Sequence, residues 1–279
     1  MGVIRRVARS ISAFAGHDSE LVTRLRPAYQ QWLVWSTSRR GMPQTVNGRE
    51  RFRIDPRHRM HFPETYDAGV CAYLRERVRP GSTCLNVGAH FGVYTLCLCE
   101  WSRPNGRVYA FEPNPHTRRV LETHVRLNHY ESRVRVVDAA VSDTHGRSTF
   151  FAAGECFSGI SRLGRPNPAL PDAPTAPLDV SVTTIDAFCR DAGVVPDWIV
   201  MDIEGYEIRA LRGASQTLRR GRPHLGIMVE MHPGLWAASA TSRGDLEDLL
   251  RAVALRAVPL SGQRDPLGEH GIVRLEYGT

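Results

Sequence analysis

The sequence predicts an α/β fold with a doubly wound, mostly parallel sheet and a helical extension at the N-terminus. Strand-like apolar runs alternate with helical segments from residue 84 onward, which is the pattern of consecutive βαβ units. A glycine-containing turn joins the first of these strands to its helix, and Glu112 ends the second strand. Both features are typical of α/β folds that bind a nucleotide-like cofactor.

The N-terminal segment is predicted to be basic and helical. Apolar residues recur at helical spacing over 3–14 and again over 21–33, where Pro27 is expected to kink or divide the helix. Residues 1–63 hold twelve arginines against four acids. We therefore predict a basic helical extension over 1–63 and one α/β domain over 64–279. The extension would cap the sheet or form a homodimer contact.

The remaining elements follow in order along the chain. Residues 48–63 form an arginine-rich connector, and the next helix ends near Pro80. Strands are predicted at 84–89, 107–112 and 134–141, with helices at 92–101 and 115–128 between them. A short antiparallel strand at 147–151 precedes a surface loop over 163–178, which contains five prolines and is either a lid or an inert insertion. The last elements are a strand from 180, a short helix at 185–193, a strand, helix and strand over 198–233, an amphipathic helix at 245–255, and closing strands at 257–260 and 271–277.

The turn within residues 84–95 indicates which class of cofactor binds. A dinucleotide site places glycines at the first, third and sixth motif positions, so that the pyrophosphate lies on the helix N-terminus. Here those positions are Gly88, His90 and Val93. The pattern favours a cofactor without phosphates, and S-adenosyl-L-methionine fits this description. A tight turn in another kind of α/β protein is the alternative.

Five motifs, taken together and in order, resemble the FkbM family of S-adenosylmethionine-dependent methyltransferases. They are LNVGAHFGVYT (85–95), AFEPNP (110–115), VVDAAVSDTHG (136–146), VTTIDAF (182–188) and MDIEGYEIRALRGA (201–214). The resemblance covers residues 64–235. It departs from the family pattern at Asn86, where Asp is usual, and at His90, where Asn is usual. Loss of the Asp charge puts cofactor affinity in doubt, because the sulfonium and amino groups of the cofactor are positive.

The resemblance implies a set of residues around the cofactor. Gly88 and Ala89 would contact its methionine part, and Glu112 its ribose. Asp138 and Ala139 would contact the adenine, because the third strand ends beside the base in this fold family. The full set of candidate cofactor-binding residues is Asn86, Gly88, Ala89, His90, Gly92, Thr95, Glu112, Asp138 and Ala139.

Acidic residues and a histidine end two later strands, and they are the candidates for catalysis. Asp202 and Glu204 share one face, as do Glu230 and His232. We predict that His232 takes the proton from an acceptor hydroxyl, with Asp202 or Glu204 as the second choice. Backbone bonding of His232 and helix capping by the acids are the alternatives. Such residues also suit magnesium or manganese, but a polyol-binding cleft explains them equally, and no metal is expected.

Composition limits the remaining function classes. The chain has no lysine, so a lysine base or Schiff base is excluded. Its six cysteines show no CxxC spacing, which predicts reduced thiols in a cytoplasmic protein. No apolar run approaches the length of about eighteen residues that a membrane span requires, and no nucleic-acid motif accompanies the arginines. The basic segment would attract an acidic partner, a membrane surface or an anionic carrier, or form a solvated face.

We therefore interpret the chain as an S-adenosylmethionine-dependent O-methyltransferase of the FkbM type. Its acceptor would be a hydroxyl group of a secondary metabolite, a sugar or a glycan, a class that the resemblance implies. Two alternatives remain: a non-catalytic binding protein that keeps the fold, and a nicotinamide-dependent oxidoreductase, which the missing glycine disfavours.

Overall fold

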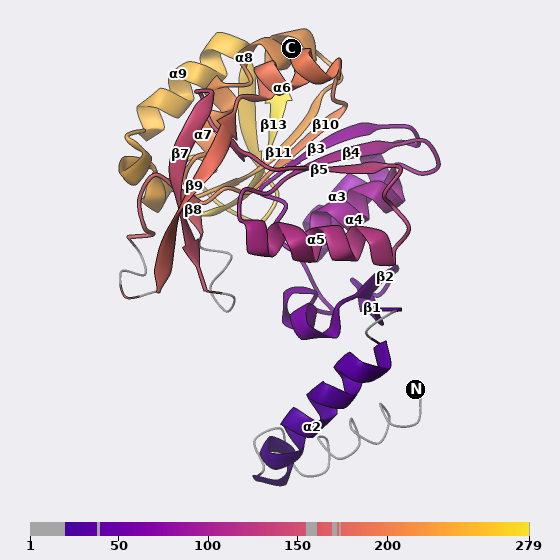
Figure 1. Ribbon diagram of the computed structural model, residues 1–279. Coiled ribbons are helices and arrows are strands. Elements are labelled where there is room, and N and C mark those ends of the chain that lie inside the picture. Colours follow the sequence, from indigo (N-terminus) through magenta and orange to yellow (C-terminus); the bar gives the residue numbers. More distant parts are fainter. Residues whose placement is uncertain (1–19, 38–39, 155–160, 169–171, 173, 279) are drawn as a thin grey trace.

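The centre of the protein is a seven-stranded mixed sheet (Figure 1). The computed structural model describes residues 20–37, 40–154, 161–168, 172 and 174–278. Five strands are parallel, namely β3 (Thr83–Val87), β4 (Arg107–Phe111), β5 (Val134–Val137), β10 (Trp198–Met201) and β11 (Gly226–Met231). Beside β11, β13 (Gly271–Tyr277) is antiparallel and pairs in turn with β12 (Leu255–Pro259). The predicted α/β class is confirmed, and the sheet is mixed.

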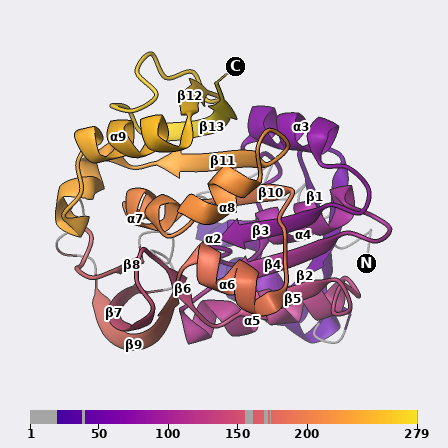
Figure 2. The same ribbon diagram turned by 90° about the horizontal axis from the view of Figure 1, so that it is seen from above.

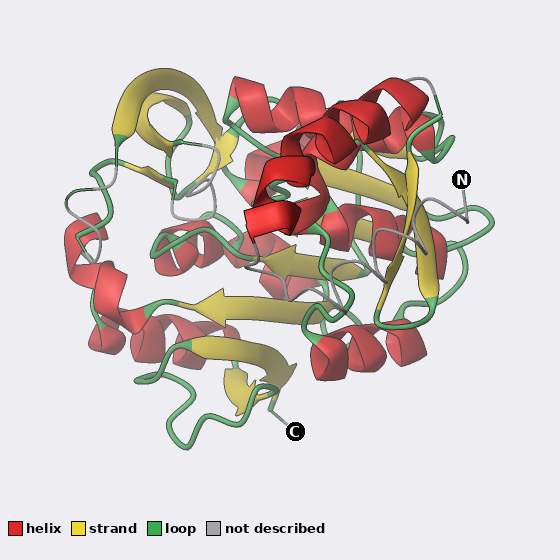
Figure 3. Cartoon of the chain, turned by 90° about the horizontal axis from the view of Figure 1, so that it is seen from below, coloured by secondary structure: helices red, strands yellow, loops and turns green. Residues whose placement is uncertain are grey.

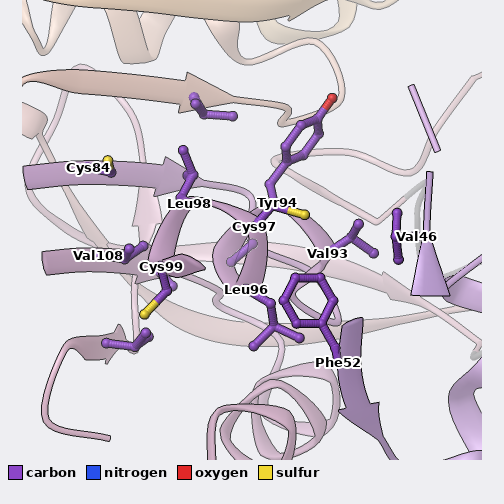
Figure 4. Packing of buried hydrophobic residues seen from close by; sticks show 14 of the residues in the cluster. Val46, Phe52, Cys84, Val93, Tyr94, Leu96, Cys97, Leu98, Cys99 and Val108 are labelled. Atoms are coloured by element: carbon purple, nitrogen blue, oxygen red, sulfur yellow. The ribbon is translucent and has the colours of Figure 1, made fainter. Parts of the chain in front are cut away.

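Helices cover both faces of this sheet (Figure 2). One face carries α3 (Ala68–Arg77), α4 (Val93–Trp101) and α5 (Pro115–Leu127). The other carries α6 (Ile185–Ala192), α7 (Glu207–Arg212), α8 (Ser215–Arg220) and α9 (Arg243–Val253). Residues 93–99 of α4 are all buried, as expected for a helix that is apolar on every side. Figure 4 shows this helix between Cys84 and Val108 of the sheet and Val46 and Phe52 of the N-terminal hairpin.

The register aligns the carboxyl ends of the central strands. Val87 lies opposite Phe111 on one side and Met201 on the other. The segments that follow β3, β4 and β10 therefore emerge side by side, and they carry most of the residues predicted to form the site.

A second, four-stranded sheet lies beside the first (Figure 3) and corrects two predictions. Its order is β6 (Ala140–Val141), β9 (Thr175–Thr183), β7 (Gly146–Ala153) and β8 (Arg162–Leu163). The predicted strand 134–141 is divided between the two sheets. The predicted loop 163–178 contains the start of β9, where Pro177 lies opposite Phe151. Since β6 pairs with Val182 and Thr183, no described strand pairs with the other edge of β9 at Pro177, where proline is tolerated.

The N-terminal segment is only partly helical. It contains the helix α2 (Glu20–Thr37), an antiparallel hairpin of β1 (Met42–Val46) and β2 (Glu50–Ile54), and the 3₁₀ helix η1 (Pro56–His61). The hairpin and η1 correct the predictions of a helical extension over 1–63 and of an irregular connector over 48–63. Pro27 lies within a continuous α2. The helix predicted over 3–14 lies outside the described residues. Buried and exposed residues alternate along β2, with Phe52 in the main core.

Two further findings concern the thiols and the membrane. Among the described residues the cysteines are free and buried, at positions 71, 84, 97, 99 and 189. Cys156 lies outside these residues. No helix in the described part of the chain is long and apolar enough to cross a bilayer.

Candidate active site

A cavity of about 490 Å³ opens at the aligned carboxyl ends of β3, β4 and β10. Its volume lies within the range of small-molecule sites. The segments that follow these strands form much of its wall, and residues of η1, β6, β7 and β8 are among the others that line it. The predicted residues that line it are Gly88, Ala89, His90, Gly92, Glu112, Ala139, Asp202 and Glu204.

Both glycines of the turn are required by packing as well as by backbone conformation. Gly88 has a φ of 83°, and a Cβ atom there would lie 1.8 Å from the carbonyl oxygen of Asp202. Gly92 has a φ of 101°, and a Cβ atom there would lie 2.5 Å from Leu121. The sequence analysis related these glycines to the cofactor. In the structure they also let β3 approach β10 and let α4 approach α5.

Glu112 is the central polar group at one end of the cavity. Its Oε2 accepts a hydrogen bond from the backbone N–H of His90 at 2.8 Å, and its Oε1 accepts one from Asn114 at 2.9 Å. Burial raises the pKa of Glu112 to about 7, although these hydrogen bonds act in the opposite direction. Each carboxylate oxygen keeps a second lone pair, so both can still accept a ligand hydroxyl.

His90 is held in a left-handed backbone conformation, with a φ of 50°. Histidine and asparagine are both enriched in this region, so the departure from the family's usual Asn preserves the backbone preference. Burial lowers the pKa of His90 to about 3, helped by the neighbouring His61 and His58, so its imidazole is neutral at physiological pH.

Three of the predicted cofactor-binding residues do not line the cavity. Asn86 is 1% exposed, and its Oδ1 accepts a hydrogen bond from the hydroxyl of Thr95 at 2.7 Å. The exposed Asp138 forms an ion pair with Arg118 at 2.5 Å, outside the cavity. The neighbouring Ala139 does line it. Direct cofactor contacts by Asn86, Thr95 and Asp138 stay predictions.

Asp202 and Glu204 form the acidic end of the cavity. Glu204 has a φ of 50°, an unfavourable conformation for a side chain of this kind. Burial raises the pKa of Glu204 to about 7, although the charge of His232 opposes this. Burial and the charge of Glu230 raise the pKa of Asp202 well above its usual range. Two carboxyl groups of raised pKa therefore face the same space.

His232 lies behind these carboxylates and does not line the cavity. Its Nδ1 is 2.9 Å from Oε1 of Glu207, a fully buried carboxylate. Glu207 also accepts hydrogen bonds from the backbone N–H of Gly205 at 2.7 Å and from Nε1 of Trp236 at 2.8 Å. Burial alone would lower the pKa of His232, but the bond to Glu207 and the nearby acids raise it to about 10.

Two residues of the site were missed by sequence reasoning. Glu207 lies three positions after Glu204 in the same motif, and this third carboxylate could have indicated it. Arg162 lines the cavity, is 1% exposed, and donates to the carbonyl oxygen of Leu235 at 3.4 Å. Within the described residues, its Nε and Nη1 have no hydrogen-bond partner. No local pattern signals Arg162, because its position depends on pairing between distant strands.

Comparisons with known proteins were made against family models, curated proteins and solved structures. Residues 86–255 match the family model described as the Methyltransferase FkbM domain. No curated protein matches the chain.

Three solved structures are similar at low identity. Methyltransferase FkbM from Methylobacillus flagellatus KT has 18% identity and a TM-score of 0.48, covering 70% of this chain and 44% of that chain. Aeropyrum pernix fibrillarin, in complex with S-adenosyl-L-methionine, has 13% identity and a TM-score of 0.39, covering 74% and 73%. A SAM-dependent methyltransferase from Aquifex aeolicus has 15% identity and a TM-score of 0.38, covering 73% and 86%. The chain thus spans less than half the length of the Methylobacillus protein.

Proposed function

The chain belongs to the FkbM family of methyltransferases, and from this premise we propose that it transfers a methyl group from S-adenosyl-L-methionine to a hydroxyl group. The acceptor is a secondary metabolite, a sugar or a glycan. When bound, S-adenosyl-L-methionine supplies an electrophilic methyl group on a positively charged sulfur.

Hydrogen-bond acceptors and apolar wall in the cavity support this choice of cofactor. Glu112 offers acceptor positions for two ribose hydroxyls and is fixed by two backbone N–H groups. The turn at Gly88 and Ala89 allows a close approach to the backbone at the methionine part. Pro113 and Ala139 supply apolar wall for the adenine. The acids at the other end favour the positive sulfonium and amino groups.

The acceptor binds at the acidic end in this proposal. Asp202 and Glu204 line the cavity there, orient the hydroxyl and accept its proton. Alignment of the hydroxyl with the methyl donor alone can lower the barrier by several kcal/mol. His232, our first choice for the base, is held by Glu207 behind these carboxylates. We therefore assign the proton transfer to these carboxylates and not to His232.

One observation carries the proposal: a single cavity joins a buried, backbone-fixed carboxylate, Glu112, to a separate acidic end at Asp202 and Glu204. Glu112 suits the ribose of the cofactor. The acidic end suits a hydroxyl acceptor beside the positively charged sulfonium of the methyl donor. Residues of both ends lie within the segment that matches the family model.

Calorimetric titration with S-adenosylhomocysteine tests the cofactor site. We expect micromolar binding by the wild type and at least a tenfold loss in Glu112→Ala, because both ribose contacts disappear. Glu122→Ala is the control, since Glu122 is exposed on α5 and lies away from the cavity. Wild-type protein that binds a nicotinamide dinucleotide and no S-adenosylhomocysteine would overturn the proposal in favour of an oxidoreductase.

Methyl transfer is then measured with labelled S-adenosyl-L-methionine and a panel of hydroxylated metabolites and sugars. We expect label in at least one acceptor, and a loss of about a hundredfold in Asp202→Asn. Tight S-adenosylhomocysteine binding without transfer to any acceptor of the panel would favour the non-catalytic alternative.

A further inference from the structure

Three carboxylates surround Nε2 of His232 without forming a hydrogen bond to it. This nitrogen is 3.7 Å from Oε1 of Glu204, 3.9 Å from Oδ1 of Asp202 and 4.0 Å from Oε1 of Glu230. All three distances exceed the usual length of an N–H···O hydrogen bond. The His232 side chain is 9% exposed. A buried ring nitrogen thus points into a group of acceptors and is separated from each by a gap.

The orientation of His232 is fixed from behind. Its Nδ1 contacts Glu207, which is itself held by Gly205 and Trp236. This arrangement keeps a proton on Nδ1 and leaves Nε2 directed at Asp202 and Glu204. Metal-binding histidines are generally held in this way, with a carboxylate on the nitrogen that does not bind the metal.

Four acids share one imidazole in this cluster, so their negative charge exceeds what His232 alone can balance. Asp202, Glu204, Glu207 and Glu230 converge on one imidazole. The chain contains 36 basic residues, all of them arginine, yet in the described part of the chain no arginine forms an ion pair with any of the four acids. Nor does any described residue donate a hydrogen bond to the carboxylate of Asp202. Partly buried like charges are costly unless a cation joins them.

We propose that Asp202, Glu204 and His232 bind a divalent first-row transition-metal ion. Their ligand atoms lie within 4.8 Å of one another. Ligands around an ion at about 2.1 Å are separated by roughly 3 Å when adjacent and about 4 Å when opposite, so small side-chain movements close the site. Two oxygen ligands with one imidazole nitrogen favour manganese, iron or zinc over calcium.

A second triad, Glu230, His232 and His270, shares the same imidazole. His270 is 64% exposed and is already 3.0 Å from Oε1 of Glu230. We therefore place the ion on the cavity side, where Asp202 and Glu204 leave positions open to a ligand. Glu230, held by His270, borders the ion and adds negative charge.

The role of the ion rests on the proposed function. A cation at the acidic end would polarise an acceptor hydroxyl bound there and favour the loss of its proton. The proton passes to the carboxylate oxygen of Asp202 or Glu204 that does not bind the ion, so these residues remain the base while the ion positions the acceptor. No metal was expected from the sequence, because the acids alone also suit a polyol. The fixed orientation of His232 is the observation that favours a metal.

The test uses the full chain, stripped with EDTA and titrated with MnCl₂ by calorimetry and by electron paramagnetic resonance, without cofactor or acceptor. We expect one Mn²⁺ per chain. Asp202→Asn should weaken binding at least tenfold, and among the described residues its carboxylate accepts no hydrogen bond that the substitution would break. His232→Gln should do the same. Asp248→Asn is the control, because Asp248 is an exposed carboxylate on α9 that pairs with Arg251.

The same titrations with CaCl₂ distinguish a specific transition-metal site from non-specific attraction of cations to acidic residues. We expect much weaker Ca²⁺ binding, with little effect of His232→Gln on it, because calcium has little affinity for imidazole. Absence of Mn²⁺ uptake, or uptake that is unchanged in both Asp202→Asn and His232→Gln, would overturn the proposal. Titration of the metal-free protein with S-adenosylhomocysteine tests the proposed function separately.

Discussion

The backbone of Gly88 lies directly against the carbonyl group of Asp202, with space for no side chain between them. The contact follows from the register of β3 and β10, in which Val87 and Met201 are paired. It brings the turn that we assign to the cofactor next to the acidic end of the cavity. Glycine at position 88 therefore allows the turn that we assign to the cofactor to lie close to the acidic end of the cavity.

Replacement of Gly88 by Ala should therefore be severe. A Cβ atom would clash with backbone and also occupy a φ of 83°, so we expect the free energy of unfolding to fall by about 3 kcal/mol or more, with loss of S-adenosylhomocysteine binding. Gly81→Ala is a matched control, because Gly81 has a φ of 85° and open surroundings. It should cost only about 1 kcal/mol. Urea denaturation measures both, and equal losses would refute the steric explanation.

The affinity for S-adenosylhomocysteine should depend on pH through Glu112. The ionised carboxylate is the better acceptor for ribose hydroxyls, and its pKa is about 7 because of burial. Affinity should rise between pH 6 and pH 8, and should fall by up to about tenfold per pH unit below 7. Calorimetry at several pH values measures this, and Glu112→Gln should bind weakly with a flat profile.

The same group should affect stability with the opposite trend. Its folded-state pKa is about 7, above its usual value of 4.5, so the folded state binds the proton more tightly than the unfolded state. The contribution to stability is complete below pH 4.5 and is lost as pH rises through 7. Relative to Glu112→Gln, the ligand-free wild type should lose about 3 kcal/mol across this range. Parallel curves for the two proteins would contradict this assignment.

Glu204 should show a conflict between stability and activity. Its φ of 50° costs about 1 kcal/mol for a residue with a side chain. Glu204→Gly should therefore be more stable than Glu204→Ala by about this amount, while both lose methyl transfer. Thermal unfolding and transfer assays on the two variants measure the difference. If the alanine variant is the more stable, the strained conformation is not present in solution.

Glu207 should be important for stability because it is fully buried and accepts three hydrogen bonds. Glu207→Ala leaves those donors unpaired, and we expect a loss of about 3 to 5 kcal/mol. Trp236→Phe removes one donor and keeps most of the apolar surface, so about 1 to 2 kcal/mol is expected. Denaturant unfolding compares them, and a loss below 1 kcal/mol in Glu207→Ala would contradict the buried network.

Much of the main sheet could be predicted from the sequence. The strands that become β3, β4 and β10 are short apolar runs buried on both faces, and such runs are visible without knowledge of their partners. The position of Glu112 at the cavity followed from the strand that precedes it. The glycines were correctly placed in the turn, but their contacts with Asp202 and Leu121 depend on distant segments.

Features that depend on long-range pairing could not be predicted. The prolines of 163–178 concealed β9, because only the sheet order reveals that no described strand pairs with its other edge at Pro177. Arginines concealed the alternation of β2, where Arg51 and Arg53 are the exposed members. The contact between His232 and Glu207 joins residues 25 positions apart, and neither motif alone indicates it.

The second sheet is formed by one continuous segment of the chain, which lies between β5 and α6 of the main fold. It begins at β6, directly after β5, and returns through β9 to Thr184, the N-cap of α6. Phe150, Arg162 and Leu163 of this segment form part of the cavity wall. Glu112 and the glycine turn also line the cavity but lie outside this segment. Sequence changes between residues 140 and 183 would therefore alter the shape of the cavity and its choice of acceptor, while Glu112 and the glycine turn, which we assign to the cofactor, stay unchanged.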